Sequence, residues 1–110
     1  MLAEIALRHF YLIVVPTTVY NVPAPAHVVE ALRFEVKTAL AQAFGGYTET
    51  LGNGGYVADS GELIEEPVFL IRAAYQTPND ELVAGLAQKI KTALHQETVM
   101  IQRDHEVYFV

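Results

Sequence analysis

Apolar positions recur along the chain with two periods, one typical of strands and one typical of helices. Between Ile5 and Val15 the side chains are largely β-branched or aromatic, which predicts a strand over residues 9–15 that ends at Pro16. Both faces of this strand are apolar, because Phe10, Leu12 and Val14 alternate with Tyr11, Ile13 and Val15. A strand without a polar face is typical of the centre of a sheet that is covered on both sides.

Two later segments have helical spacing. Apolar residues over 27–44 recur every three or four positions, with most charged residues on the other faces, which predicts an amphipathic helix. Thr77-Pro78-Asn79-Asp80 is typical of a helix start, with a capping hydroxyl, proline at the first helical position and an acid in the first turn. A second helix of about fifteen residues is therefore expected after it.

The stretch between the two helices, residues 44–75, holds six of the seven glycines. We expect a strand over 47–51, a glycine-rich break over 52–55 and a short strand over 56–58. Asp59-Ser60-Gly61 predicts a hairpin turn, and Val68 to Ile71 predicts a buried return strand. The glycines precede a strand rather than a helix, so a phosphate-binding loop is disfavoured.

Further strands are expected over 98–102 and 105–110. The complete order is that of an α+β, ferredoxin-like βαββαβ domain over residues 1–110, with a possible extra C-terminal strand. Its antiparallel sheet would carry both helices on one face and leave the other face open. We expect that open face to be apolar and to be covered by a second copy of the chain. The apolar side chains assigned to it are Ile13, Val15, Val68, Leu70 and Met100.

The charge and the residue composition argue against several classes of function. The formal net charge is −6 and the seven Lys and Arg residues are scattered, which argues against a nucleic-acid partner. The chain has no cysteine, so disulfides and thiolate metal sites are excluded. The apolar run over 12–15 is too short for a membrane span. A cytoplasmic protein with no membrane partner is expected.

The segment from Tyr47 to Glu97 resembles CutA-type cation-tolerance proteins and PII-like signalling proteins. The resemblance rests on the run GGYVADSGELIEEPVFLIRAAY and the leucine-containing helix after it. It implies a ferredoxin-like fold, a long central hairpin and assembly into trimers. The chain lacks the cysteine and tryptophan that often accompany the CutA pattern, so no metal role is carried over. The same run also resembles hypothetical proteins of unknown function.

Four residues are candidates for binding a ligand. His9, Tyr11 and Arg72 are predicted to share the open face of two neighbouring central strands, where they could hold a carboxylate or move a proton. The competing interpretation places them in a subunit interface, where Tyr and Arg are enriched. Tyr20 lies in a proline-rich stretch over 16–26, expected to be irregular and either to pack across the sheet edge or to cover a site.

The acidic residues give weaker signals. Glu62 and Glu66 could share one face of the hairpin and offer two carboxylates to a cation, although solvated charge is the commoner explanation. Asp104-His105-Glu106 is interpreted as a polar turn, since consecutive strand residues point apart. No metal and no cofactor are expected. The favoured function is a non-enzymatic, homo-oligomeric ferredoxin-like module that binds a small ligand, for example an acidic one, or a partner protein. The alternative is a small cofactor-free enzyme, an isomerase, lyase or oxygenase acting on an organic acid.

Overall fold

The computed structural model describes residues 7–110 and contains two helices and seven strands. The first half of the chain forms β1, β2, β3 and α1, and the second half forms β4, β5, α2, β6 and β7. Their bounds are β1 His9–Pro16, β2 Thr18–Val19, β3 Val22–Pro23, α1 Ala26–Phe44, β4 Thr48–Val57, β5 Leu63–Tyr75, α2 Asp80–Ala93, β6 Met100–Arg103 and β7 Glu106–Phe109.

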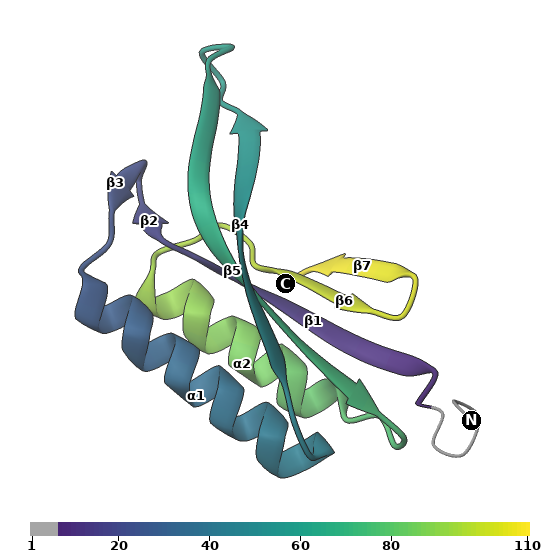
Figure 1. Ribbon diagram of the computed structural model, residues 1–110. Helices are drawn as coiled ribbons and strands as arrows, with labels where there is room; N and C mark the ends of the chain where they lie inside the picture. Colours follow the sequence, from purple (N-terminus) through teal and green to yellow (C-terminus); the bar gives the residue numbers. More distant parts are fainter. Residues whose placement is uncertain (1–6) are drawn as a thin grey trace.

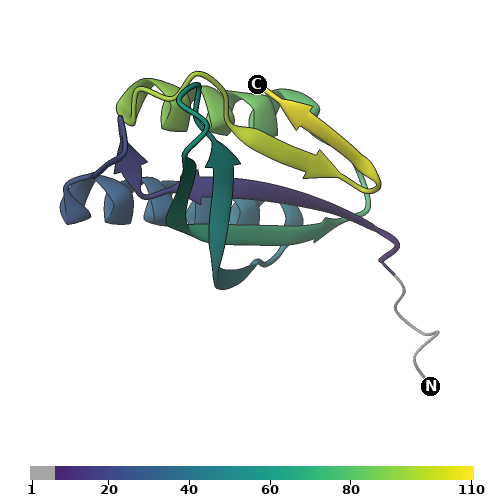
Figure 2. The same cartoon turned by 90° about the horizontal axis from the view of Figure 1, so that it is seen from above.

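The main sheet has the strand order β4-β5-β1-β6-β7, and every neighbouring pair is antiparallel. This order confirms the predicted ferredoxin-like fold, with β7 as the extra C-terminal strand. The central strand β1 pairs with β5 through Ile13 and Ile71 and with β6 through Ile13 and Ile101. Both helices lie behind the strands in Figure 2, which looks onto the open face of the sheet.

The core lies between the sheet and the two helices. From α1 it receives Val29, Leu32, Val36 and Leu40, as the helical spacing predicted. Helix α2 contributes Val83, Leu86, Ala87 and Ile90. The N-cap of α2 is Asn79 rather than Thr77, because the Asn79 side chain accepts a hydrogen bond from the Leu82 amide at 3.1 Å.

The predicted faces of β1 are wrong. Tyr11, Ile13 and Val15 are at most 1% exposed and belong to the core beneath the helices. The open face instead receives Phe10, Leu12 and Val14, which pair with the open-face positions of β5. The error arose because both faces of β1 are apolar, so alternation could not show which one meets the helices. The open face nevertheless remains apolar, and Val68, Leu70 and Met100 lie on it as expected.

Two segments, residues 18–23 and the glycine-containing part of β4, are more regular than predicted. Residues 18–23 form a miniature hairpin, β2–β3, whose turn residues Tyr20 and Asn21 have φ values of 49° and 65°. Strand β4 runs through its glycines without the expected break, since each of them pairs with a residue of β5. A methyl group at Gly54 would come within 3.2 Å of Val68, so the absence of a side chain suits this close approach.

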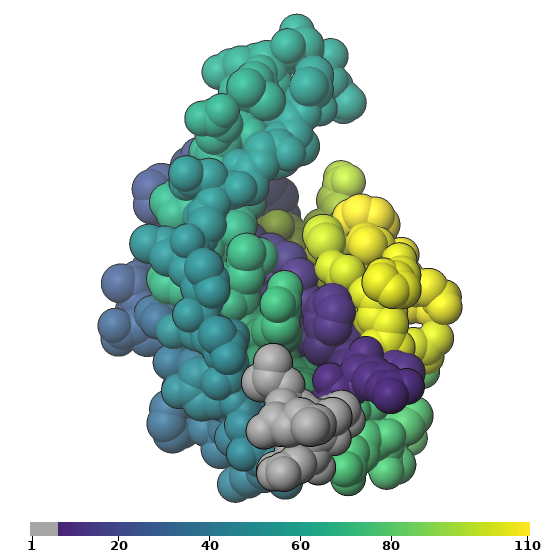
Figure 3. Space-filling view, turned by 45° about the vertical axis from the view of Figure 1, so that its right-hand side comes forward, coloured from purple at the N-terminus to yellow at the C-terminus, as the bar shows by residue number. Residues whose placement is uncertain are grey.

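The outer parts of β4 and β5 project from the body of the molecule as an arm, residues 52–67 (Figure 1). The arm rises on the side away from the helices, and the predicted turn at Gly61 closes it, with φ 85°. Figure 3 shows a hollow between the teal arm and the yellow β6–β7 hairpin, above β1. The open face is therefore concave. Within residues 7–110, no helix is both long and apolar enough to span a membrane.

Candidate functional site

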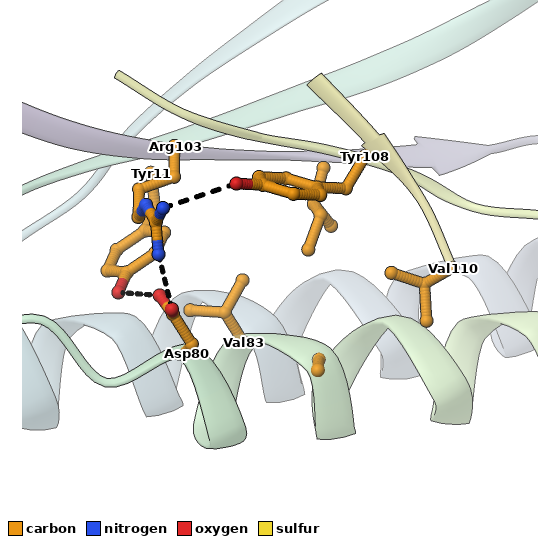
Figure 4. A pocket seen from close by; sticks show the side chains of 8 residues that line it. Tyr11, Asp80, Val83, Arg103, Tyr108 and Val110 are labelled. Atoms are coloured by element: carbon orange, nitrogen blue, oxygen red, sulfur yellow. Dashed lines mark hydrogen bonds and ion pairs between the residues drawn. The ribbon is translucent and has the colours of Figure 1, made fainter. Parts of the chain in front are cut away.

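A pocket of about 230 Å³ lies between α2 and the β6–β7 hairpin, on the helix side of the sheet (Figure 4). We call it the Arg103 pocket. One end is polar and the opposite wall is apolar. The polar side chains come from β1, α2, β6 and β7, and the apolar ones from the second turn of α2, β6 and the chain end. The lining consists of Tyr11, Asp80, Val83, Ala84, Ile101, Arg103, Tyr108 and Val110.

Tyr11 ties the central strand to the start of α2. Its hydroxyl donates a hydrogen bond to Asp80 Oδ1 at 2.7 Å and accepts one from the Asn79 amide at 2.9 Å. Asp80 is the first residue of α2, where a carboxylate interacts favourably with the helix dipole. The Tyr11 ring is 1% exposed and stacks on Tyr75 with centroids 4.5 Å apart. These contacts fix the position of the hydroxyl at the inner end of the pocket.

Arg103 spans the polar end of the pocket. Its guanidinium forms an ion pair with Asp80 and donates a hydrogen bond from Nη2 to the Tyr108 hydroxyl at 3.2 Å. The Tyr108 hydroxyl in turn donates to Glu106 Oε2 at 2.5 Å. Arg103 is positioned by β6 and Tyr108 by β7, so this chain of contacts depends on the β6–β7 pairing. Figure 4 shows the guanidinium between Asp80 and Tyr108.

The electrostatics of the pocket favour binding over proton transfer by tyrosine. Burial and the hydrogen bond to Asp80 raise the pKa of the Tyr11 hydroxyl. The hydrogen bond to Glu106 and burial also raise the pKa of Tyr108. Both hydroxyls therefore stay protonated at neutral pH and serve as hydrogen-bond partners. The charges of Asp80 and Arg103 offset each other, which leaves room for a ligand with an apolar body and one polar end.

Of the four predicted ligand-binding residues, Tyr11 lies in this pocket and the other three lie elsewhere. His9 stands nearby at the start of β1, where its Nδ1 is 3.1 Å from Asp104 Oδ2 and its ring stacks on Tyr75. Arg72 is on the open face, with its guanidinium 4.7 Å from the Phe10 ring centroid. Tyr20 is at the far end of the helices, 79% exposed. A ligand-binding role for each remains a prediction.

The expected grouping of His9, Tyr11 and Arg72 on one face is wrong. The register pairs Tyr11 with Ala73 and Leu12 with Arg72, and paired residues share a face. Tyr11 therefore points to the helices with Ala73, while Arg72 points to the open side with Leu12. A shift of one position in β1 reverses every side chain, and the sequence contained no polar position that would have fixed it.

Asp80, Arg103 and Tyr108 were not identified from the sequence. Asp80 was interpreted as a helix-start residue, Arg103 lay between two predicted strands, and Tyr108 was one of several residues in the last of these strands. Arg103 and Asp80 are 23 residues apart, and Tyr11 and Asp80 are 69 apart. Only the strand order brings them together. The only signal for this site in the sequence was that polar residues stand near the ends of several predicted helices and strands. That signal is common to many proteins and is not specific.

The acidic hairpin forms no cluster of three or more potential metal ligands in the part of the chain that is described. No group of three or more His, Asp and Glu side chains converges within residues 7–110. Glu66 instead accepts a hydrogen bond from Thr18 Oγ1 at 2.5 Å. Asp104 and His105 form the polar turn between β6 and β7, as predicted.

No protein-family model matches the sequence, and no curated protein matches it. Two solved structures share the fold. A phage SAM lyase in complex with S-methyl-5'-thioadenosine is 18% identical and has a TM-score of 0.70, with 100% of this chain and 95% of that chain covered. A phage SAM lyase in the apo state is 19% identical, with a TM-score of 0.61 and coverage of 93% and 87%. At these identities the similarity shows a common fold, and kinship with CutA or PII-like proteins stays a prediction.

Proposed function

We propose that this chain is a cytoplasmic, homo-oligomeric module that binds a small ligand and acts, without a cofactor, as a lyase on S-adenosylmethionine (SAM). The observation that carries the proposal is the similarity of fold over the entire chain to a phage SAM lyase, one structure of which holds S-methyl-5'-thioadenosine. A lyase was among the enzyme classes that the sequence left open. SAM also carries the carboxylate of an amino acid, in keeping with the expected organic-acid substrate.

The chemistry of such a cleavage needs no redox partner. When the C–S bond to the four-carbon chain breaks, the sulfur keeps the electron pair and becomes the neutral thioether of S-methyl-5'-thioadenosine. The four-carbon fragment is completed when its own carboxylate attacks the carbon that sulfur leaves, or when it loses a proton. The positive charge on sulfur disappears in either case. A site with little water favours that loss of charge.

The Arg103 pocket is the site that we assign to this ligand. Its wall opposite the polar end is apolar, and the partly exposed Tyr108 ring can attract a cation such as a sulfonium. The carboxylate of the amino-acid part would share the Arg103 guanidinium with Asp80, its present ion-pair partner. A volume of about 230 Å³ is below the 300–1,000 Å³ of typical small-ligand sites, so we place one part of SAM inside and the rest toward the rim.

The test is production of S-methyl-5'-thioadenosine from SAM, measured by chromatography against buffer alone. The wild-type chain should exceed the rate in buffer, and Arg103→Gln should lower the excess at least tenfold. Lys89→Gln removes an exposed ion pair with Glu35 and is the matched control, expected to keep full activity. If the wild-type chain forms no product above the buffer rate, the lyase proposal fails. If Arg103→Gln keeps full activity, the reaction stands and the pocket is not its site.

The homo-oligomer is proposed from the concave open face. Phe10, Val14, Leu70 and Met100 are half-buried there, and Phe109 on β7 is 68% exposed. An apolar surface of this kind is seldom left in water, and a second copy of the chain is the simplest cover. The face has few polar groups to satisfy a different kind of ligand.

Molar mass by light scattering tests the assembly. The wild-type chain should exceed the monomer mass of 12.2 kDa at all concentrations, and Leu70→Glu should reduce it to the monomer. Phe34→Glu is the matched control, because Phe34 is 70% exposed on α1, away from the open face. Circular dichroism would show that both variants are folded. A wild-type monomer at every concentration would contradict the proposal.

A further inference from the structure

A second pocket, of about 420 Å³, lies where the β2–β3 hairpin meets the ends of the two helices. We call it the His95 pocket. It is separate from the Arg103 pocket, because Ala84 lines one and Ala93 lines the other, nine residues or about 14 Å apart along α2. Its walls include Val19, Val22, Pro23, Val28, Ala93 and His95.

The His95 pocket has the size of a small-ligand site and no charged side chain in its lining. Its volume falls within the 300–1,000 Å³ range of such sites. Apart from His95, the residues that line it are aliphatic or proline. An ionic group placed in it would find no charged partner among these side chains, so the lining favours an occupant with an uncharged, apolar body.

An aromatic pair stands at the edge of this pocket. The rings of Tyr20 and His95 are nearly parallel, with an interplanar angle of 14° and centroids 6.1 Å apart. This separation is within the range of favourable offset stacking. His95 belongs both to the stack and to the pocket wall, so a planar ring in the pocket would contact an aromatic side chain that is already oriented.

The backbone that presents this pair is sterically unfavourable. Tyr20 and His95 have φ values of 49° and 50°, a left-handed conformation that is uncommon for residues other than glycine. It is retained because neighbouring contacts fix the β2–β3 hairpin. The Tyr56 hydroxyl donates to Asn21 Oδ1 at 2.5 Å, and Gln96 Nε2 donates to the Thr18 carbonyl at 2.8 Å. At Tyr20 this φ belongs to the two-residue turn of the β2–β3 hairpin, and at His95 it follows the C-cap of α2, so local structure accounts for both.

We infer that the His95 pocket is a binding site for an uncharged planar aromatic molecule, stacked on the His95 ring, which Tyr20 supports from its other side. The site goes beyond the proposed lyase function and does not depend on it. Its walls come from the ends of two helices and from prolines with fixed φ, so the site is formed before the ligand arrives. Tyr20 does not line the pocket, so its part in this site would be to orient the His95 ring.

Indole is a suitable probe, and nuclear magnetic resonance of the isotope-labelled chain is a suitable readout. Titration should give saturable shifts at Val28, Ala93 and His95, with a millimolar or lower dissociation constant. Ala93→Phe should fill the pocket and abolish these shifts, and it should fold normally because Ala93 is exposed. Ala84→Phe makes the same change in the Arg103 pocket and should leave them intact. Tyr20→Ala removes the ring that stacks on His95, so the indole should lose an oriented partner and binding should weaken about two- to tenfold.

Three results would overturn the inference. The first is an absence of saturation up to the solubility limit of indole. The second is a set of shifts that map to the Arg103 pocket instead, and the third is unchanged binding in Ala93→Phe. None of these results bears on the formation of S-methyl-5'-thioadenosine from SAM, so the two proposals stand or fall separately.

Discussion

The two halves of β5 differ in what surrounds them, although they form one continuous strand. From Val68 onward β5 pairs with β1 as well as β4, and Ile71, Ala73 and Tyr75 are at most 5% exposed. Before Pro67 it pairs with β4 alone, and Leu63 is 59% exposed. The arm thus keeps its ladder of hydrogen bonds without a core. In the arm, pairing between β4 and β5 is enough to form the strands. Burial of side chains is found only in the body of the molecule.

Pro67 marks the boundary between the two halves. It is the last residue of the outer half that has no β1 partner, since the β1 pairing begins at Val68. A proline has no amide to donate, and at this position no ladder hydrogen bond is lost. Its carbonyl accepts a hydrogen bond from Thr17 Oγ1 at 2.6 Å, just beyond the end of β1.

Alanine substitutions in the two halves should show the largest difference. Ile71→Ala removes buried methyl groups and leaves a cavity, so we expect the free energy of unfolding to fall by about 2–5 kcal/mol. Leu63→Ala in the arm should change it by less than about 0.5 kcal/mol, because the side chain is exposed. Urea denaturation of both variants measures the two values. A loss at Leu63 as large as that at Ile71 would mean that the arm is covered in solution.

A smaller difference is expected between the contributions that acidic side chains of the body and of the arm make to the free energy of unfolding. In the body, Glu49 accepts hydrogen bonds from Arg33 Nε at 2.9 Å and Arg33 Nη2 at 2.8 Å. The Arg33 hydrogen bonds, with the nearby charge of Lys37, lower the pKa of Glu49. A carboxyl with a lowered pKa in the folded state stabilises the fold above its unfolded pKa, about 4.3, and loses that contribution as the pH falls through the folded value.

Glu49→Gln should therefore lower the free energy of unfolding by about 1 kcal/mol at pH 7 and reduce its fall below pH 5. Glu65→Gln, an exposed change in the arm, is the control and should leave the pH profile of the wild-type chain unchanged. Denaturation at pH 7, 5, 4 and 3 gives both profiles. Equal profiles for Glu49→Gln and the wild-type chain would show that the Arg33 pair contributes nothing to stability.

Features that depend on local sequence could be predicted, whereas features that depend on pairing with a distant strand could not. The helix spacing over 27–44 and the turn at Gly61 are local signals, and the structure confirms both. The order of elements was enough to give the ferredoxin-like sheet. That β4 continues through its glycines could not be predicted from the local sequence. Each of these glycines is held in the strand by a residue of β5, to which it is paired.

The candidate site was less predictable than the fold. Tyr11 was identified, but its face was assigned wrongly because both sides of β1 are apolar. Asp80, Arg103 and Tyr108 each had an ordinary local explanation, and only the pairing of β1 with β6 and of β6 with β7 brings them together. A site built from element ends that are far apart in sequence leaves no spacing to recognise.

The place of β1 in the chain also has a kinetic consequence. Phe10 exchanges hydrogen bonds with Asp104, 94 residues later, and the other partner of β1, β5, is complete only at Tyr75. At ordinary rates of translation, about 5 to 20 s separate the synthesis of Phe10 from that of Asp104. Until β5 is complete, a strand with two apolar faces has neither neighbour, and its β6 side stays uncovered to the end of that interval. We therefore expect slow folding and a need for chaperones in the nascent chain.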